Sequence, residues 1–199
     1  MAIYGGVIGA ALGIIVFSKV KKVNLFAVLD LVAISFLIGQ AIGRWGNFMN
    51  REAFGAPVSE NYFLAMGLFN RYLGEYQYFH PTFLYESLWD VVGFIALHFL
   101  SKKRQYDGQI ALGYVAWYGL GRAIVEGLRT DSLWWGPFRV SQLLAAISCV
   151  AAVTVLLVQA FRVHDRANLY VNRVSAKATE AAEEPAVEEA EEETTETAE

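Results

Sequence analysis

Apolar residues run almost unbroken through five stretches of the chain, separated by short polar or charged segments. The five stretches are residues 3–20, 26–42, 83–100, 109–128 and 140–161. Each is close to or above the roughly 20 residues that an α-helix needs to cross the hydrocarbon core of a bilayer. The pattern therefore predicts an all-α integral membrane protein with about five transmembrane helices.

Basic residues follow the first, third and fifth of these stretches. The three clusters are Lys19, Lys21 and Lys22, then Lys102, Lys103 and Arg104, then Arg162 and Arg166. If every stretch spans the membrane, all three clusters fall on one side, which the positive-inside rule assigns to the cytoplasm. Residues 43–82 and 129–139 then form loops on the outer, periplasmic side.

The composition changes after Tyr170, where Ala, Glu and Thr dominate. Such a segment has too few apolar residues to offset the entropy of folding. We therefore expect a transmembrane body over residues 1–170 and a disordered acidic cytoplasmic tail over residues 171–199.

The overall net charge of −4 describes this tail and not the body. Ten of the 20 acidic residues lie in residues 180–199, and none of the 16 Lys and Arg residues does. Without that segment 16 basic residues face ten acidic ones, which leaves +6. A basic membrane body suits anionic lipid head groups, or simply reflects the charge of cytoplasmic loops. Both interpretations remain open at this stage.

The chain lacks the residues for a thiolate metal site or an internal disulfide, because Cys149 is its only cysteine. No cluster of metal-ligand residues is evident in the sequence, so we expect neither a metal nor another cofactor. With 55% hydrophobic and 18% charged residues, the chain is also too apolar for an ordinary soluble domain.

Charged residues inside membrane helices are costly and usually face protein or water. Tyr118, Arg122, Glu126 and Arg129 are spaced four, four and three positions apart. They therefore fall within about 80° of one helix face. One interpretation is a structural Arg–Glu pair that locks two helices together. The other is an anion site, because the guanidinium fork matches phosphate oxygens.

A second polar group lies in residues 39–55, where four glycines surround five polar residues. These are Arg44, Asn47, Asn50, Arg51 and Glu52. We expect a polar loop where the second helix reaches the outer surface, either as a binding site or as a re-entrant loop that only caps the helix.

A third group begins at His80 and includes Glu86 and Asp90, which lie one helical turn apart. His80 is either a base or a cap, and we expect Glu86 to pair with an arginine of the polar groups. We give Asp30 and His98 structural roles.

These segments carry a family resemblance. Residues 43–55 match every fixed position of the Gly-Arg-x-Gly-Asn-Phe-x-Asn-x-Glu-x-x-Gly signature of the bacterial diacylglyceryl transferases. Residues 80–86 resemble the family's His-Pro-Ser/Thr-x-Leu-Tyr-Glu segment, and residues 118–129 resemble its Tyr-x-x-x-Arg-x-x-x-Glu-x-x-Arg helix. Residues 3–10 resemble its His-Gly-Gly stretch, with Tyr4 in place of the histidine.

The resemblance implies a multi-pass enzyme of the bacterial cell membrane. It would transfer a diacylglyceryl group from phosphatidylglycerol to the lipobox cysteine of a preprolipoprotein signal peptide, as the first step of lipoprotein maturation. Membrane lipids would be its other partners, and nucleic acid would not be one. Family members begin with further N-terminal membrane sequence that nothing here matches. We therefore expect an N-terminally truncated chain, and its activity alone stays open.

The resemblance and the residue chemistry together give two candidate sets. The catalytic set is Arg44, Glu52, Tyr118, Arg122 and Glu126. The substrate-binding set is Tyr4, Arg44, Asn47, Asn50, Gly55, His80, Arg122 and Arg129. The alternatives to an active transferase are a non-catalytic fragment of one and a membrane transporter for an anionic substrate.

Within these sets, Arg44 and Arg122 would hold the phosphate and therefore converge inside the membrane. Asn47 would orient the head group and Tyr118 would donate to a phosphate oxygen. Glu52 and Glu126 would position the arginines, or one of them would serve as the base.

Overall fold

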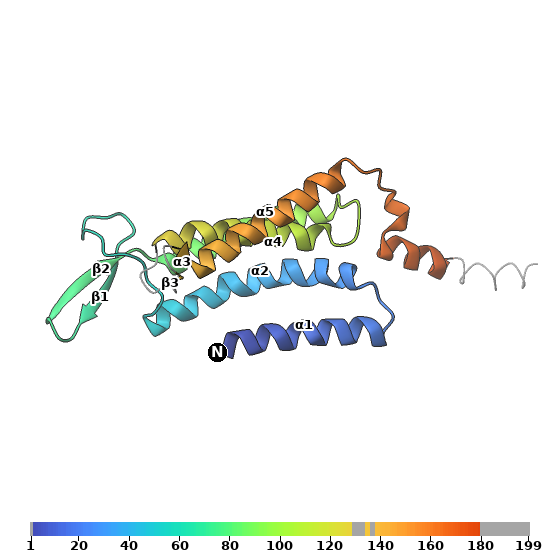
Figure 1. The fold of residues 1–199 in the computed structure, drawn as a ribbon. Coiled ribbons are helices and arrows are strands. Elements are labelled where there is room, and N and C mark those ends of the chain that lie inside the picture. The colour runs from blue at the N-terminus through green and yellow to red at the C-terminus, as the bar shows by residue number, and fades with distance from the viewer. Residues whose placement is uncertain (1, 129–133, 136–137, 180–199) are drawn as a thin grey trace, which may run out of the picture.

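The computed structural model describes residues 2–128, 134–135 and 138–179, and within them helices predominate (Figure 1). The five long helices are α1 (Ala2–Val20), α2 (Leu25–Asn50), α3 (Thr82–Ser101), α4 (Gln109–Val125) and α5 (Val140–Ala160). A 3₁₀ turn, Glu126–Leu128, continues α4. Helix α4 packs on α5, α2 and α3, while α1 lies against α2.

Three of these helices, α2, α3 and α5, are long and apolar enough to cross a membrane. Among the residues described at side-chain level, α1 contributes a shorter apolar helix, Ile8–Val20, and α4 has 17 residues. The predicted helical membrane character is thus supported for three helices, and the number five stays a prediction. Large apolar side chains such as Leu31, Ile42 and Leu144 remain exposed along the helices, as expected for surfaces that face lipid.

Helix α2 runs further than the sequence pattern predicted. The predicted helix ended at residue 42, but residues 43–50 continue it without a break. Glycine lowers helix propensity, yet tertiary packing of α2 on α3 overrides it. Arg44 and Asn47 therefore lie on the last turns of a helix, and neither the predicted loop nor a re-entrant loop begins at Gly43. The helix ends at Arg51, which adopts the left-handed conformation with φ of 54°.

The expectation of an all-α protein missed two small β-hairpins. Strands β1 (Met66–Asn70) and β2 (Glu75–Phe79) pair antiparallel in the segment between α2 and α3, with Met66 opposite Phe79. Gly74 closes their turn with φ of 72°, a conformation that glycine adopts without strain. Strands β3 (Trp134–Trp135) and β4 (Phe138–Arg139) form a second short pair before α5.

A helix occupies the start of the segment assigned to the tail. Residues 170–179 are helical, and the backbone amide of Tyr170 donates to an Asp107 carboxylate oxygen at 3.0 Å. Leu169 is buried just before this helix. Residues 180–199, which hold the acidic run, lie outside the described residues.

Asp30 has the structural role expected of it. Its carboxylate, 1% exposed, accepts hydrogen bonds at 2.9 Å from the backbone amides of Gly108, Ile110 and Ala111. The residue preceding α4 is Gly108, which has no side chain to cap the helix, so a carboxylate from α2 satisfies these amides instead.

We expect Asp30→Asn to lower the free energy of unfolding by about 2 kcal/mol. The amide NH₂ would face backbone donors where the carboxylate now accepts. The measurement is the unfolding midpoint in detergent. Asp165→Asn is the matched control, because Asp165 caps only the exposed turn at Arg166–Asn168 through the amide of Ala167. Equally small losses of stability in the two variants would contradict the role of Asp30 as a buried cap of α4.

Candidate functional site

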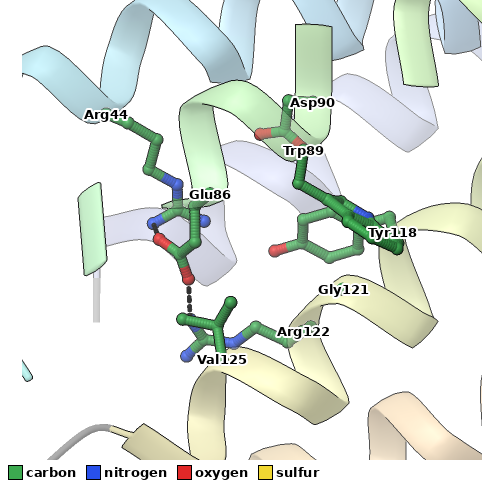
Figure 2. Close-up of a pocket in the computed structure, with 8 residues that line it drawn as sticks. All are labelled: Arg44, Glu86, Trp89, Asp90, Tyr118, Gly121, Arg122 and Val125. Carbon is green, nitrogen blue, oxygen red and sulfur yellow. Dashed lines mark hydrogen bonds and ion pairs between the residues drawn. The ribbon is translucent and has the colours of Figure 1, made fainter. Parts of the chain in front are cut away.

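Glu86 joins two arginines from two other helices (Figure 2). Its carboxylate, on α3, lies 2.8 Å from Nη1 of Arg44 on α2 and 3.0 Å from Nη1 of Arg122 on α4. Nη2 of Arg122 also lies 2.7 Å from the carboxylate of Glu126. The predicted convergence of Arg44 and Arg122 is confirmed, as is the predicted pairing of Glu86 with an arginine. Arg122 and Glu126 also form an ion pair across one helical turn. This is the Arg–Glu pair that the structural interpretation of the stripe required.

The contact between α2 and α3 sets the position of Arg44 relative to Glu86. Ser87 donates to the Ala41 carbonyl at 2.9 Å and receives a hydrogen bond from the Trp45 indole at 3.3 Å. The ring of Phe83 lies against those of Trp45 and Phe48. Each of these contacts involves a residue within four positions of Arg44 or Glu86, so the helix register that packs them also brings the ion pair together.

A pair of tryptophans links α3 to α4, and one of them, Trp89, lines the site. The indole of Trp89 donates to the Trp117 carbonyl, and the indole of Trp117 donates to the Trp89 carbonyl, both at 3.0 Å. The rings stack with their centroids 4.4 Å apart. A Cβ at Gly93 would lie 2.3 Å from the Trp117 indole nitrogen, and a Cβ at Gly121 equally close to that of Trp89. Only glycine at these two positions leaves room for the pair.

Together these residues enclose a small pocket. Its lining consists of Arg44, Glu86, Trp89, Asp90, Tyr118, Gly121, Arg122 and Val125. The enclosed space is about 10 Å³, which is room for one water molecule. A phosphate would therefore enter only if side chains move.

Asp90 contributes a buried carboxylate to the pocket. It is 2% exposed, and its Oδ2 has no hydrogen-bond partner among the described residues. Tyr118 lines the same pocket, and its ring stacks on that of Tyr114. Tyr118 and Arg122 therefore share one site, as the spacing predicted. The sequence analysis noted Asp90 only for its spacing from Glu86. A second acidic residue one turn further along an apolar helix could have indicated a site residue.

Glu52 contacts two asparagines, and neither Arg44 nor Arg122 is among its partners in the described part of the structure. Its predicted catalytic role stays a prediction. Its carboxylate accepts hydrogen bonds from the amide groups of Asn47 at 3.3 Å and Asn50 at 3.1 Å, and it forms no ion pair with any described residue. Helix α2 ends at Arg51, so Glu52 lies just beyond its last turn and contacts Asn47 and Asn50 of that end instead of Arg44. Glu86, and not Glu52, contacts both arginines.

Gly55 and His80 lie together outside the pocket. The amide of Gly55 donates to the His80 carbonyl at 2.9 Å, and a Cβ at Gly55 would come within 2.7 Å of the His80 Cβ. Nδ1 of His80 lies 3.2 Å from the Tyr85 hydroxyl. These contacts give Gly55 a packing role, and the substrate-binding roles of both residues stay predictions.

Two further predicted residues are not described at side-chain level. Tyr4 belongs to α1, but its side chain lies outside the described part of the structure. Arg129 lies outside the described residues altogether.

The chain is similar to known proteins over most of its length. The family model for prolipoprotein diacylglyceryl transferase matches residues 1–158. A protein of Listeria monocytogenes serotype 4b is 47% identical over 161 residues, one of Bacillus cereus 44% over 163, and one of Enterococcus faecalis 43% over 166. All three are named phosphatidylglycerol–prolipoprotein diacylglyceryl transferase.

These matches cover 79–80% of this chain and 58–60% of the relatives. The chain thus spans about three-fifths of the length of the relatives it matches. The matched residues include all three polar segments that carry the site. This chain belongs to the prolipoprotein diacylglyceryl transferase family.

Proposed function

We propose that this chain transfers the diacylglyceryl group of phosphatidylglycerol to the lipobox cysteine of a preprolipoprotein signal peptide in the bacterial cell membrane. The observation that carries the proposal is the convergence of Arg44 and Arg122 on one carboxylate, with a pocket beside it. Family membership and the names of the relatives support the reaction type and the two substrates.

In this reaction the substrate's cysteine sulfur attacks the glycerol carbon that bears the phosphate ester. A C–S bond forms, the C–O bond to phosphate breaks, and glycerol phosphate leaves with the bond's electron pair. The thiol proton passes to a base. The nucleophile belongs to the substrate, so the enzyme's own Cys149 is not required.

The two arginines would hold the phosphate through the N–H groups that Glu86 and Glu126 leave unused. Each guanidinium has five N–H donors. The contacts in the structure use Nη1 of Arg44 and both Nη atoms of Arg122. The phosphate diester of the lipid carries one negative charge, and the departing monoester carries more. The arginines therefore grip the departing group more strongly than the bound lipid, which lowers the barrier.

Glu86 would be a positioning residue. Its carboxylate occupies the space between the two forks and fixes their separation before substrate binds. Tyr118 lies beside them and would donate its hydroxyl to a phosphate oxygen.

Asp90 is our proposal for the group that accepts the thiol proton. Glu126 is engaged by Arg122, and Glu52 by two asparagines. Oδ2 of Asp90, by contrast, has no donor among the described residues and belongs to a pocket-lining side chain. A buried carboxylate without a hydrogen-bond donor is the stronger base.

We also propose that all five helices span the membrane. The pocket then lies toward the outer side, because its residues come from the last turns of α2, the beginning of α3 and the last turns of α4. In Figure 1 these ends lie near the β1–β2 hairpin, at the opposite end of α2 from the turn after α1. That turn carries Lys21 and Lys22, which the positive-inside rule assigns to the cytoplasm.

Arg122→Lys tests this function. The charge is kept, but an ammonium does not reproduce the planar fork. We expect transfer to fall about ten- to a hundredfold, since one charge-assisted hydrogen bond is worth roughly 1.5–3 kcal/mol. The measurement is transfer of labelled diacylglyceryl to a lipobox peptide, normalised to folded protein in the membrane.

Arg162→Lys is the matched control, because Arg162 is exposed beyond α5. Full specific activity of the Arg122 variant would return Arg122 to helix packing. Binding of phosphatidylglycerol by the unmodified chain without any lipidated peptide would identify a non-catalytic chain instead.

A further inference from the structure

A second hollow, rich in basic side chains, lies at the other end of the bundle. The basic hollow is lined by Lys22, Val23 and Asn24 from the turn between α1 and α2, and by Tyr170, Arg173, Val174 and Lys177 from the helix of residues 170–179. Its volume is about 340 Å³. Three of the described lining residues are cationic and none is acidic, so the hollow has the charge and the size for a small anionic group.

Asp107 holds the two walls of the basic hollow together. One oxygen of its carboxylate accepts hydrogen bonds from the Tyr170 amide at 3.0 Å and from the Asn24 side chain at 3.4 Å. Arg166, just before the C-terminal helix, donates to the carbonyls of Lys102 and Arg104 at 3.1 and 3.2 Å. The helix that carries Arg173 and Lys177 is therefore anchored at its start on the loop between α3 and α4.

Lys22 occupies a position where helix ends usually have glycine. The amide of Val23 donates to the Ser18 carbonyl and that of Lys22 to the Lys19 carbonyl, which is the Schellman pattern of a helix end. Lys22 has φ of 53°, a left-handed conformation that is unfavourable for a residue with a Cβ. Helix capping alone would favour glycine at this position. The presence of Lys22, whose side chain lines the hollow, is therefore not explained by capping.

The basic hollow also lies next to exposed apolar surface. Val20 at the end of α1 is 71% exposed, and Phe26 at the start of α2 is 58% exposed. These side chains flank the turn that forms one wall of the hollow. A ligand with an anionic head and apolar chains would place the head among the cations and the chains against the helices.

We propose that the basic hollow binds the head group of an anionic phospholipid from the leaflet on this side of the membrane. The site is distinct from the proposed transfer site, because Asn24 and Arg44 are 20 residues apart along the chain and span about 30 Å of α2. It also depends on residues 170–179, which lie beyond the family match that ends at residue 158. The proposal therefore stands whether or not the chain transfers diacylglyceryl groups.

The test compares two triple variants of the full chain with equal loss of charge. One is Lys22→Gln, Arg173→Gln, Lys177→Gln in the basic hollow. The other is Lys21→Gln, Lys103→Gln, Arg162→Gln, at exposed positions on the same side that do not line the hollow. The measurement is binding of phosphatidylglycerol to detergent-purified protein, counted by native mass spectrometry over a titration.

We expect the wild-type chain and the exposed-position variant to bind one more phosphatidylglycerol than the hollow variant. The affinity for that lipid should fall roughly a hundredfold, since each of the three lost cations contributes about fivefold near an anionic surface. Phosphatidylcholine should not occupy this site, and water-soluble glycerol phosphate should bind it far more weakly than the lipid. Arg122→Lys should leave this binding step unchanged, which separates it from the transfer site.

Equal binding by the two triple variants, with both folded by circular dichroism, would overturn the proposal. So would equal binding of phosphatidylcholine, or binding of glycerol phosphate as tight as that of the lipid. A gain of the additional phosphatidylglycerol only after deletion of residues 180–199 would show that the acidic segment, and not a lipid, fills the hollow in this chain.

Discussion

Replacing Gly121 by alanine is expected to lower the free energy of unfolding by about 3 kcal/mol. The new Cβ would lie 2.3 Å from the indole nitrogen of Trp89, far inside van der Waals contact. Trp89 cannot move away without losing its 3.0 Å hydrogen bond to the Trp117 carbonyl and its stacking on the Trp117 ring. Overpacking, a lost hydrogen bond and a lost aromatic contact therefore act together.

The measurement is the unfolding midpoint in detergent together with near-ultraviolet circular dichroism, which reports on stacked tryptophans. Gly93→Ala should lower the unfolding midpoint in the same way, since its new Cβ would clash with the Trp117 indole. Gly9→Ala is the control, because nothing lies within 4 Å of a Cβ at that position on α1. Alanine there should be neutral or slightly stabilising. A Gly121→Ala variant with an unchanged midpoint and spectrum would mean that the two helices separate without cost.

The helices were predictable because apolar residues must extend over about 20 positions to cross a bilayer. The end of α2 was not, because Gly43 and Gly46 read as loop residues until the packing of α3 on α2 is known. The β1–β2 hairpin was missed for a similar reason. Its strands are only five residues long, and their aromatic residues lie in a segment already assigned to a polar loop.

The site was predictable where an isolated charge inside the membrane would be too costly without a partner of opposite charge. An arginine at membrane depth needs an anion, which pointed to convergence of Arg44 and Arg122 and to an arginine partner for Glu86. Sequence did not show that one carboxylate serves both arginines. Glu52 was assigned to the arginines because nearness along the chain was taken for nearness in space. Glu52 lies beyond the end of α2 and contacts Asn47 and Asn50, whereas Arg44 pairs with Glu86 from α3. The tryptophan pair was missed because Trp89 and Trp117 meet only when α3 and α4 pack.

Glu86→Gln should separate the structural and catalytic contributions of the arginine pair. The amide keeps the shape of the side chain but removes the charge that Arg44 and Arg122 share. Removing one partner of a buried ion pair costs roughly 3–5 kcal/mol. The two arginine side chains are 18% and 20% exposed, so solvent screens them in part and we expect about 3 kcal/mol of lost stability.

The kinetic effect of Glu86→Gln has two opposing parts. Glu86 offsets part of the positive charge of the two guanidinium groups, so its removal should strengthen their attraction for the lipid phosphate and lower KM for phosphatidylglycerol. It also fixes the separation of the forks, so its removal should lower kcat by at least about tenfold, because a small displacement of a catalytic group is costly. The measurement is kcat and KM for transfer to a lipobox peptide, with Glu60→Gln, at an exposed position in the segment between α2 and α3, as the control. A purely structural role predicts less folded protein with both constants unchanged per folded molecule. A raised KM would show that Glu86 assists phosphate binding instead of weakening it.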